Sequence, residues 1–132
     1  KTGQEDLIKE DAPVTRIVAT LLRYAVDGHA SDIHVEPIED KIRVRFRVDG
    51  VLATSIELPL KVQSAIVARI KILASLRLDE KRKPQDGRFS ATIDGRKIDF
   101  RVSILPTYYG EKVVMRILDP DSDVRSLETI GV

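Results

Sequence analysis

The 132-residue sequence contains no cysteine and only two histidines, His29 and His34. The absence of cysteine excludes a disulfide-stapled scaffold, a thiolate zinc site and a cysteine nucleophile. Two histidines without an HExxH or similar spacing do not predict a metal site. No apolar run approaches the roughly 20 residues of a membrane-spanning helix, and no signal peptide opens the chain. We therefore expect no direct membrane insertion.

An excess of charge of one sign is also missing. The 22 Lys and Arg residues are balanced by 21 Asp and Glu residues, which leaves a formal net charge of +1. Such a balance produces no strong field toward nucleic acid. Aromatic residues make up only 5% of the chain, and its three phenylalanines are predicted to point to the core: Phe46, Phe89 and Phe100. A stacking platform for nucleic acid is therefore poorly supported, and no nucleic-acid partner is expected.

Phosphate-binding loops are missing as well. The sequence has no GxxxxGK[ST] loop, no GxGxxG loop and no nucleophile–base pair, so the chain alone is not expected to be an enzyme. It begins at Lys1 rather than at methionine and ends at the apolar Val132. We interpret it as a piece of a longer protein, with part of the function outside these residues.

A helical pattern follows a polar opening segment. Residues 1–11 show little periodicity and are predicted to be a flexible leader. Asp11 suits a helix N-cap and Pro13 suits the first turn. Apolar residues then recur at helical spacing until Gly28, which is predicted to end the helix as its C′ residue. This stripe consists of Val14, Ile17, Val18, Leu21, Leu22 and Ala25.

The pattern then changes to the alternation of strands. Residues 33–36 and 42–48 alternate, and Asp49-Gly50 predicts a two-residue hairpin turn into a third strand over 51–58, closed by Pro59. A second helix is predicted over about 60–76, with Val62, Ala65, Ile66, Arg69, Ile70 and Leu73 on one side.

Three further strands complete the pattern. A charged segment over 77–83 precedes Pro84-Gln85-Asp86-Gly87, whose composition predicts a turn. Strands are predicted over 89–93, 98–104 and 112–118, with Asp94-Gly95 as a turn between the first two. Gly87 and Gly110 are interpreted as turn residues. The acidic stretch 119–132 is predicted to begin a linker or a helix.

The element order αβββαβββ predicts the fold class. Hairpin-linked strands pair antiparallel, and each one-faced helix can bury its stripe on one face of the sheet. We expect a single α+β domain over residues 12–118, with a PAS-like antiparallel sheet and the helices on one side. The apolar share of 42% and the charged share of 33% suit an ordinary globular domain.

Two sets of arginines are candidate functional residues. Arg43, Arg45 and Arg47 alternate with apolar residues, so they share one sheet face, as either an anion-binding surface or a solvated face opposite the core of Ile42, Val44, Phe46 and Val48. The second set is Arg88, Arg101 and Arg116, one on each of three successive strands, where the side chains can converge. These arginines are either held for a partner or paired internally with Asp99 or Asp86.

His34 and the nearby carboxylates carry a weaker signal. A single histidine in a strand is more often a hydrogen-bonded structural residue than a general base. Asp32, Glu36 and Asp49 are scattered carboxylates without a catalytic context, and Asp49 is explained by its turn.

Six strings in series then give the sequence a recognisable character. They are Asp11-Ala-Pro-Val-Thr-Arg16, Ala30-Ser-Asp-Ile-His-Val-Glu-Pro37, Val44-Arg-Phe-Arg-Val-Asp-Gly50, Lys83-Pro-Gln-Asp-Gly-Arg88, Asp99-Phe-Arg-Val-Ser103 and Gly110-Glu-Lys-Val-Val-Met-Arg116. In this order they resemble the domain that precedes the P-loop ATPase domain in bacterial type II secretion and type IV pilus assembly ATPases. The resemblance covers roughly residues 11–120.

The resemblance implies a role at a nucleotide site. The parent would be a homohexameric motor that hydrolyses ATP with Mg²⁺, both bound mainly by a C-terminal ATPase domain, and residues 119–132 would begin the linker to that domain. This domain would close on the ATP of its own or a neighbouring ATPase domain and supply arginines to the phosphates. The matching positions are Arg88 and Arg101, with Arg116 as a weaker third.

The resemblance also implies partners and a location. The motor would be cytoplasmic, peripheral at the inner membrane through secretion or pilus platform proteins. The surface bearing Arg43, Arg45, Arg47, Asp32, His34 and Glu36 would face another domain or subunit. An alternative function is a freestanding PAS-like domain that senses a ligand or binds another protein.

Overall fold

The computed structural model describes residues 14–118 of the chain. The predicted leader over 1–11, the N-cap role of Asp11, the place of Pro13 in the first turn and the linker over 119–132 lie outside these residues. Within them, helices and strands follow the predicted order αβββαβββ, so the α+β class is confirmed. The elements are α2 (Val14–Asp27), β1 (Asp32–Pro37), β2 (Lys41–Val48), β3 (Val51–Pro59), η1 (Leu60–Val62), α3 (Gln63–Leu73), β4 (Gln85–Ile93), β5 (Arg96–Thr107) and β6 (Gly110–Leu118).

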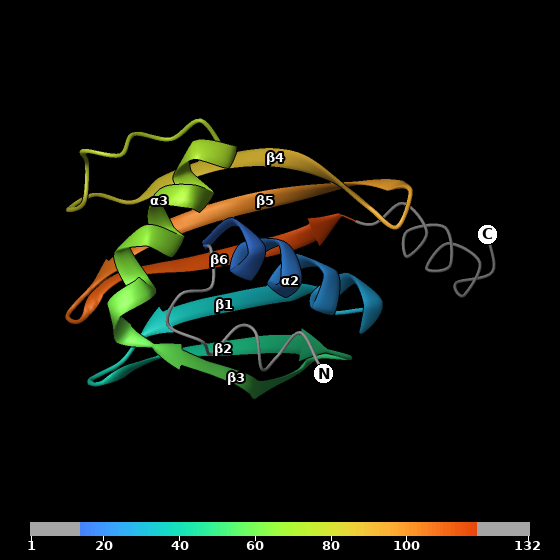
Figure 1. The fold of residues 1–132 in the computed structure, drawn as a ribbon, viewed down its shortest axis with the longest axis horizontal. Coiled ribbons are helices and arrows are strands. Elements are labelled where there is room, and N and C mark those ends of the chain that lie inside the picture. Colours follow the sequence, from blue (N-terminus) through green and yellow to red (C-terminus); the bar gives the residue numbers. More distant parts are fainter. Residues whose placement is uncertain (1–13, 119–132) are drawn as a thin grey trace.

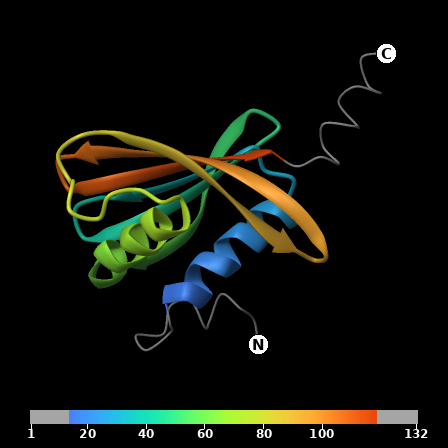
Figure 2. The ribbon, with the colours of Figure 1, turned by 90° about the horizontal axis from the view of Figure 1, so that it is seen from above.

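The six strands form one sheet in the order β3-β2-β1-β6-β5-β4. Each neighbouring pair is antiparallel, so two three-stranded meanders meet where β1 pairs with β6. Figures 1 and 2 show α2 and α3 on the same face of this sheet, as predicted. The helices leave the other face uncovered within the described part of the chain. The PAS-like character of the sheet stays a prediction.

The core lies between the helices and the sheet. Inward residues of the strands are apolar and buried, because side chains two apart along a strand share a face. The three phenylalanines are buried as predicted: Phe89 stacks on Phe100 with ring centroids 5.0 Å apart, and the edge of Phe46 meets Tyr24 at 5.1 Å. Val48, predicted to belong to this core, is 37% exposed because it lies at the hairpin end of β2.

The end of α2 differs from the prediction by one residue. His29, not Gly28, adopts the left-handed backbone conformation, with φ of 59°. The Ala30 N–H donates to the Ala25 carbonyl at 2.9 Å and the His29 N–H to the Val26 carbonyl at 3.1 Å. These two bonds form a Schellman motif with His29 at C′. Glycine is the usual residue there, which explains the error.

The second helix is shorter than the predicted span of 60–76. A 3₁₀ turn over Leu60–Val62 precedes α3, and α3 ends at Leu73. Ser75 has φ of 59°, and the Leu76 N–H donates to the Lys71 carbonyl, so the last residues form a second cap. The buried face of α3 includes Lys71, whereas Ala65 of the predicted stripe is exposed.

The predicted turn at residues 84–87 is wrong. Residues 85–87 begin β4 and pair with residues 102–104 of β5. A Cβ on Gly87 would lie 2.9 Å from Leu76 Cδ2 and 3.0 Å from the Ala74 carbonyl oxygen. The glycine is therefore required for close approach of the chain after α3, rather than for a turn. Gly110, by contrast, does lie at a turn, with φ of 134° at the start of β6.

The two Asp-Gly turns are confirmed. Asp49 and Gly50 have φ of 53° and 81°, and Asp94 and Gly95 have φ of 52° and 80°. Two consecutive positive φ values are typical of the type I′ turn, whose twist matches that of the flanking strands. In the β4–β5 hairpin the register continues without a shift from the turn and places Arg88 opposite Arg101, whereas the β2–β3 register shifts between Val44 and Arg45.

Candidate functional site

The uncovered face of the sheet is rich in charged side chains. It opposes the apolar face in strict alternation, so the burial pattern of β2 places Arg43, Arg45 and Arg47 together, as predicted. Each of these three is only partly exposed and has a carboxylate of β1 within ion-pair distance. Their surroundings on β1 decide what they do.

The second set of arginines forms a straight row across the sheet. Arg88 of β4 lies directly opposite Arg101 of β5, and Arg101 lies directly opposite Arg116 of β6. The row continues through Asp32 of β1 to Arg47 of β2. Five charged residues from five neighbouring strands therefore share one line, four of them arginines.

Arg88 and Arg101 have no hydrogen-bond or ion-pair partner within residues 14–118. The two carboxylates that were candidates for internal pairing accept from serines instead. Ser90 Oγ donates to Asp99 Oδ1 at 2.5 Å, and Ser103 Oγ donates to Asp86 Oδ1 at 2.7 Å. Both arginines are exposed, and like charges directly opposite on a sheet repel each other. Their guanidinium donors are thus available to an anion from outside these residues.

Arg116 is bound to Asp32. Its Nε donates to Asp32 Oδ1 at 3.2 Å, and Arg47 Nε lies 3.6 Å from Asp32 Oδ2. Ser31 Oγ also donates to Oδ2, at 2.9 Å. Asp32 is 6% exposed, so this carboxylate is a buried member of an otherwise open face. Sequence reasoning named Asp32 as a scattered carboxylate and as part of an interdomain or intersubunit surface, but it did not predict the contact with Arg116, because 84 residues separate the two.

A second carboxylate on β1 binds the other arginines. Glu36 accepts from Arg43 Nη2 at 2.6 Å and from Arg45 Nη2 at 2.5 Å, and Lys112 Nζ lies 3.4 Å away. Burial alone would raise the pKa of Glu36, but the two arginine hydrogen bonds and the charge of Lys112 lower it to about 2. We call Glu36, Arg43, Arg45 and Lys112 the Glu36 cluster. Its arginines are held by this carboxylate.

His34 lies between the row and the Glu36 cluster. Its Nδ1 is buried and has no hydrogen-bond partner among the residues that the structure describes. Burial lowers the pKa of His34, and the charges of Lys112 and Arg45 lower it further. The lowered pKa means that burial and the neighbouring cations favour the neutral form of the ring.

A shallow depression of about 290 Å³ lies on the row. Asp32, Arg101, Ser103, Val114 and Arg116 line it. It offers two guanidinium groups to a small anion, with one carboxylate in its wall, while the Ser103 hydroxyl that also lines it donates to Asp86. Chemically, this donor set suits phosphate or carboxylate oxygens, since arginine presents paired N–H donors to such groups.

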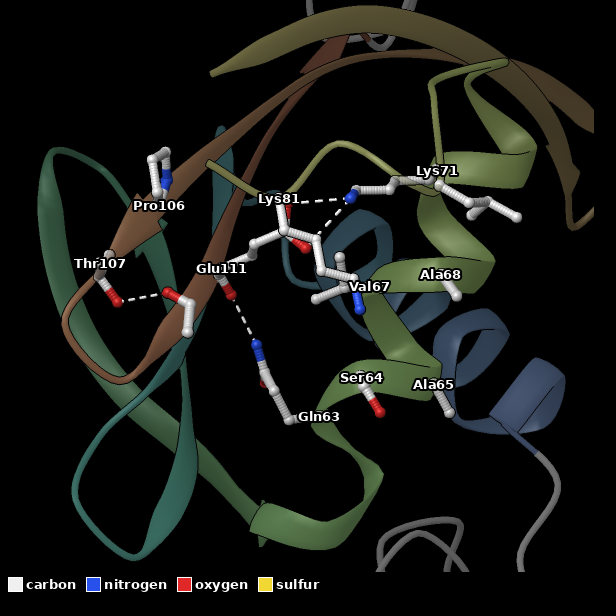
Figure 3. A pocket seen from close by; sticks show the side chains of 12 residues that line it. Gln63, Ser64, Ala65, Val67, Ala68, Lys71, Lys81, Pro106, Thr107 and Glu111 are labelled. Atoms are coloured by element: carbon white, nitrogen blue, oxygen red, sulfur yellow. Dashed lines mark hydrogen bonds and ion pairs between the residues drawn. The ribbon is translucent and has the colours of Figure 1, made fainter. Parts of the chain in front are cut away.

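A larger cavity of about 580 Å³ opens on the helix side, between α3 and the turn that joins β5 to β6 (Figure 3). Lys71, 1% exposed, donates to the Glu80 carbonyl at 2.9 Å and pairs with Glu111 Oε2 at 2.9 Å. Gln63 Nε2 donates to the Glu111 carbonyl at 2.5 Å. The bonds tie α3 to the start of β6, so these polar residues hold elements together. Sequence reasoning missed this ion pair, which joins residues 40 apart.

Residues 14–118 contain neither a metal-binding cluster nor a membrane-spanning helix. Within residues 14–118, no group of three or more His, Cys, Asp or Glu side chains is placed to hold a metal ion. None of the helices described here has the length and apolar character needed to cross a membrane.

Comparisons with known proteins agree on one family. The family model described as "Type II/IV secretion system protein" matches residues 8–132. The type IV pilus assembly ATPase PilB of Myxococcus xanthus is 53% identical over 123 residues, which cover 92% of this chain and 22% of that protein. The type II secretion system protein E of Xanthomonas campestris is 45% identical over 124 residues, covering 94% of this chain and 22% of that protein. PilB of Pseudomonas aeruginosa is 48% identical over 134 residues, with 99% and 24% covered. The chain thus spans less than a quarter of the length of these three relatives.

Proposed function

Because this chain belongs to the type II/IV secretion system protein family, we propose that it is a domain of a motor ATPase that drives secretion or pilus assembly. The named relatives are pilus assembly ATPases and type II secretion proteins that are several times longer. In the parent, this domain closes on ATP held by a P-loop domain and supplies arginines to the phosphates. Arg88 and Arg101 are the proposed contacts, with Arg116 as a third.

The pair of unpartnered arginines is the observation that carries this proposal. Arg88 and Arg101 lie directly opposite each other, exposed and without a carboxylate partner within residues 14–118. Holding two guanidinium groups side by side without a counter-charge is unfavourable in the free domain. An anion with several oxygens removes that repulsion and gains charge-assisted hydrogen bonds from both groups. A triphosphate is such an anion, and the chain's own donor set fits it.

The proposed chemical role is electrostatic. This chain supplies no phosphate-binding loop, so the downstream domain would bind the nucleotide and its Mg²⁺. Arg88 and Arg101 would orient the phosphates and offset the negative charge that develops on the transferred phosphoryl group. In phosphoryl-transfer enzymes an arginine in this role contributes about 10³-fold or more to the rate.

The proposed partners follow from the family. The domain would pack on its own or a neighbouring ATPase domain in a homohexameric ring. The Glu36 cluster, with Arg47, Asp32 and His34, would form part of that interdomain or intersubunit surface. The ring would work in the cytoplasm at the inner membrane, in contact with secretion or pilus platform proteins.

Steady-state ATPase measurements on the parent protein test the phosphate role. We expect Arg101→Gln and Arg88→Gln to lower kcat by about 10³-fold while changing nucleotide affinity much less. Arg101→Lys should not restore the rate, because lysine lacks the paired donors of the guanidinium group. Arg77→Gln is a matched control: this arginine pairs with Asp79, both side chains are more than 70% exposed, and we expect a change within about twofold.

Two results would contradict the proposal. Near-normal turnover in both Arg88→Gln and Arg101→Gln would remove the phosphate role. A parent coding sequence without a GxxxxGK[ST] loop beyond Val132 would remove the nucleotide itself and would favour the sensing or protein-binding alternative.

A further inference from the structure

Asp32 is the one carboxylate in the row of four arginines across the described sheet. In the row across the open face it lies opposite Arg116 on one side and opposite Arg47 on the other. Its side chain is 9% exposed, whereas that of Arg116 is 66% exposed. The carboxylate is therefore fixed in the sheet surface, and the arginine bound to it extends outward.

The contacts of Asp32 use the inner part of Arg116. Only Nε of Arg116 is bound to Asp32 Oδ1, and the other carboxylate oxygen accepts from Ser31 and lies near Arg47 Nε. Guanidinium has five N–H donors, so the two terminal amino groups of Arg116, which are not bound to Asp32, remain available as donors. Asp32 thus fixes the orientation of Arg116 and at the same time neutralises part of its charge.

Asp32 also lies in the wall of the depression that Arg101, Ser103 and Arg116 line. A phosphate oxygen that enters this depression meets two guanidinium groups and one carboxylate. The carboxylate repels the anion, and it competes with the anion for Arg116. At short separations a unit charge alters binding by a factor of ten or more, even where solvent screens it.

We propose that Asp32 is a positioning residue that competes with phosphate for Arg116 and keeps the phosphate affinity of the free domain low. This inference rests on the proposed function and deepens it, because it assigns regulation to the same site. The row then engages phosphates strongly only when a second domain presents them and supplies the rest of the binding free energy. A domain without this competitor would bind free polyphosphates on its own.

Titration of the 132-residue chain with sodium tripolyphosphate tests the proposal without any ATPase activity. Calorimetry at low ionic strength gives the dissociation constant for wild type and for Asp32→Asn. The amide keeps an oxygen for Arg116 Nε but removes the charge, so we expect binding about tenfold tighter. Glu57→Gln is the matched control, because this carboxylate lies on β3, pairs with Lys41 and is not in the row. It should change the constant by less than about twofold.

The Arg116→Gln substitution separates competition from a general change of charge. In wild type we expect little loss of affinity, because Asp32 already occupies Arg116. In the Asp32→Asn background the same substitution should abolish most of the gain. The double-mutant cycle of Asp32→Asn and Arg116→Gln gives the coupling between the two residues in tripolyphosphate affinity. If Asp32 had only a structural role, Asp32→Asn would give no gain in affinity.

The outcomes distinguish the two proposals. If Arg101→Gln leaves tripolyphosphate binding unchanged in wild type and in Asp32→Asn, the phosphate contact itself is wrong. If Arg101→Gln weakens binding but Asp32→Asn does not strengthen it, only the role of Asp32 is overturned. If Asp32→Asn does not fold by thermal melting, Arg116→Gln alone decides: a loss as large as that of Arg101→Gln overturns the competition.

Discussion

Three arginines of β2, Arg43, Arg45 and Arg47, differ from Arg88 of β4 and Arg101 of β5, although all five lie on one face of the same sheet. Arg43 and Arg45 are bound by Glu36, and Arg47 lies beside Asp32. Arg88 and Arg101 have no ion-pair partner among residues 14–118. The β2 arginines have neighbours on β1 with carboxylates, whereas Arg88 and Arg101 lie directly opposite each other. The partner strand, not the arginine, decides whether the charge is used within the fold or is available outside it.

The largest effect is expected from removing the carboxylate that binds Arg43 and Arg45. Glu36→Gln leaves Arg43, Arg45 and Lys112 facing one another without an anion. We expect the free energy of unfolding to fall by about 2–3 kcal/mol, measured by urea denaturation. Glu57→Gln is the control, because its ion pair with Lys41 is exposed and should contribute less than about 1 kcal/mol. Equal losses in the two variants would show that the Glu36 cluster is no more than a surface ion pair.

Lowering the pH removes the charge of Glu36 reversibly and so tests the same contacts. The pKa of Glu36 is about 2 in the folded chain and 4.5 in its ordinary state. A depressed folded pKa gives stability that is complete above about pH 5 and is lost as the pH falls toward 2. We expect a loss on the order of 2 kcal/mol from this group over that range, after screening by solvent. The difference in Tm between wild type and Glu36→Gln should therefore shrink as the pH falls from 5 to 2. A constant difference would contradict the assignment.

The smallest predicted effects are two changes in stability of opposite sign. Arg45→Thr removes a partner of Glu36, and we expect it to destabilise the chain by about 1 kcal/mol. Arg101→Thr removes a like charge between Arg88 and Arg116, and we expect it to stabilise the chain by about 0.5 kcal/mol. Both changes place a residue of good strand propensity on the same sheet face, so thermal melting compares them directly. Destabilisation of similar size in both would mean that Arg101 is used within the fold after all.

Much of the fold could be predicted because its signals are local. Strand alternation, the helical stripe of α2 and the two Asp-Gly turns each depend on a few consecutive residues. Two of the errors occurred at glycines. Each was interpreted as a cap or turn residue, but the structure shows a different reason for its position. Gly28 precedes the residue that takes the left-handed conformation, and Gly87 serves close packing within a strand.

The candidate site could be predicted only in part. Alternation placed Arg88, Arg101 and Arg116 on one face, and the observed register puts them in one row. No spacing in the sequence indicated that Asp32 would meet Arg116, because β1 and β6 lie at opposite ends of the described chain. The buried Lys71–Glu111 pair was missed for the same reason, since each partner reads alone as a surface charge.

The sequence by itself determined which residues face the core and which face outward, since that depends on periodicity of two and of 3.6 within each element. It also determined the hairpin registers, through turns that require two residues with positive φ. Only the tertiary structure decided which arginines are neutralised. Docking of the two meanders brings β1 beside β6 and gives Arg116 a carboxylate, while Arg88 and Arg101, farther from β1, receive none. Charge pairing acts over a few ångströms in space, and distance along the chain does not determine it.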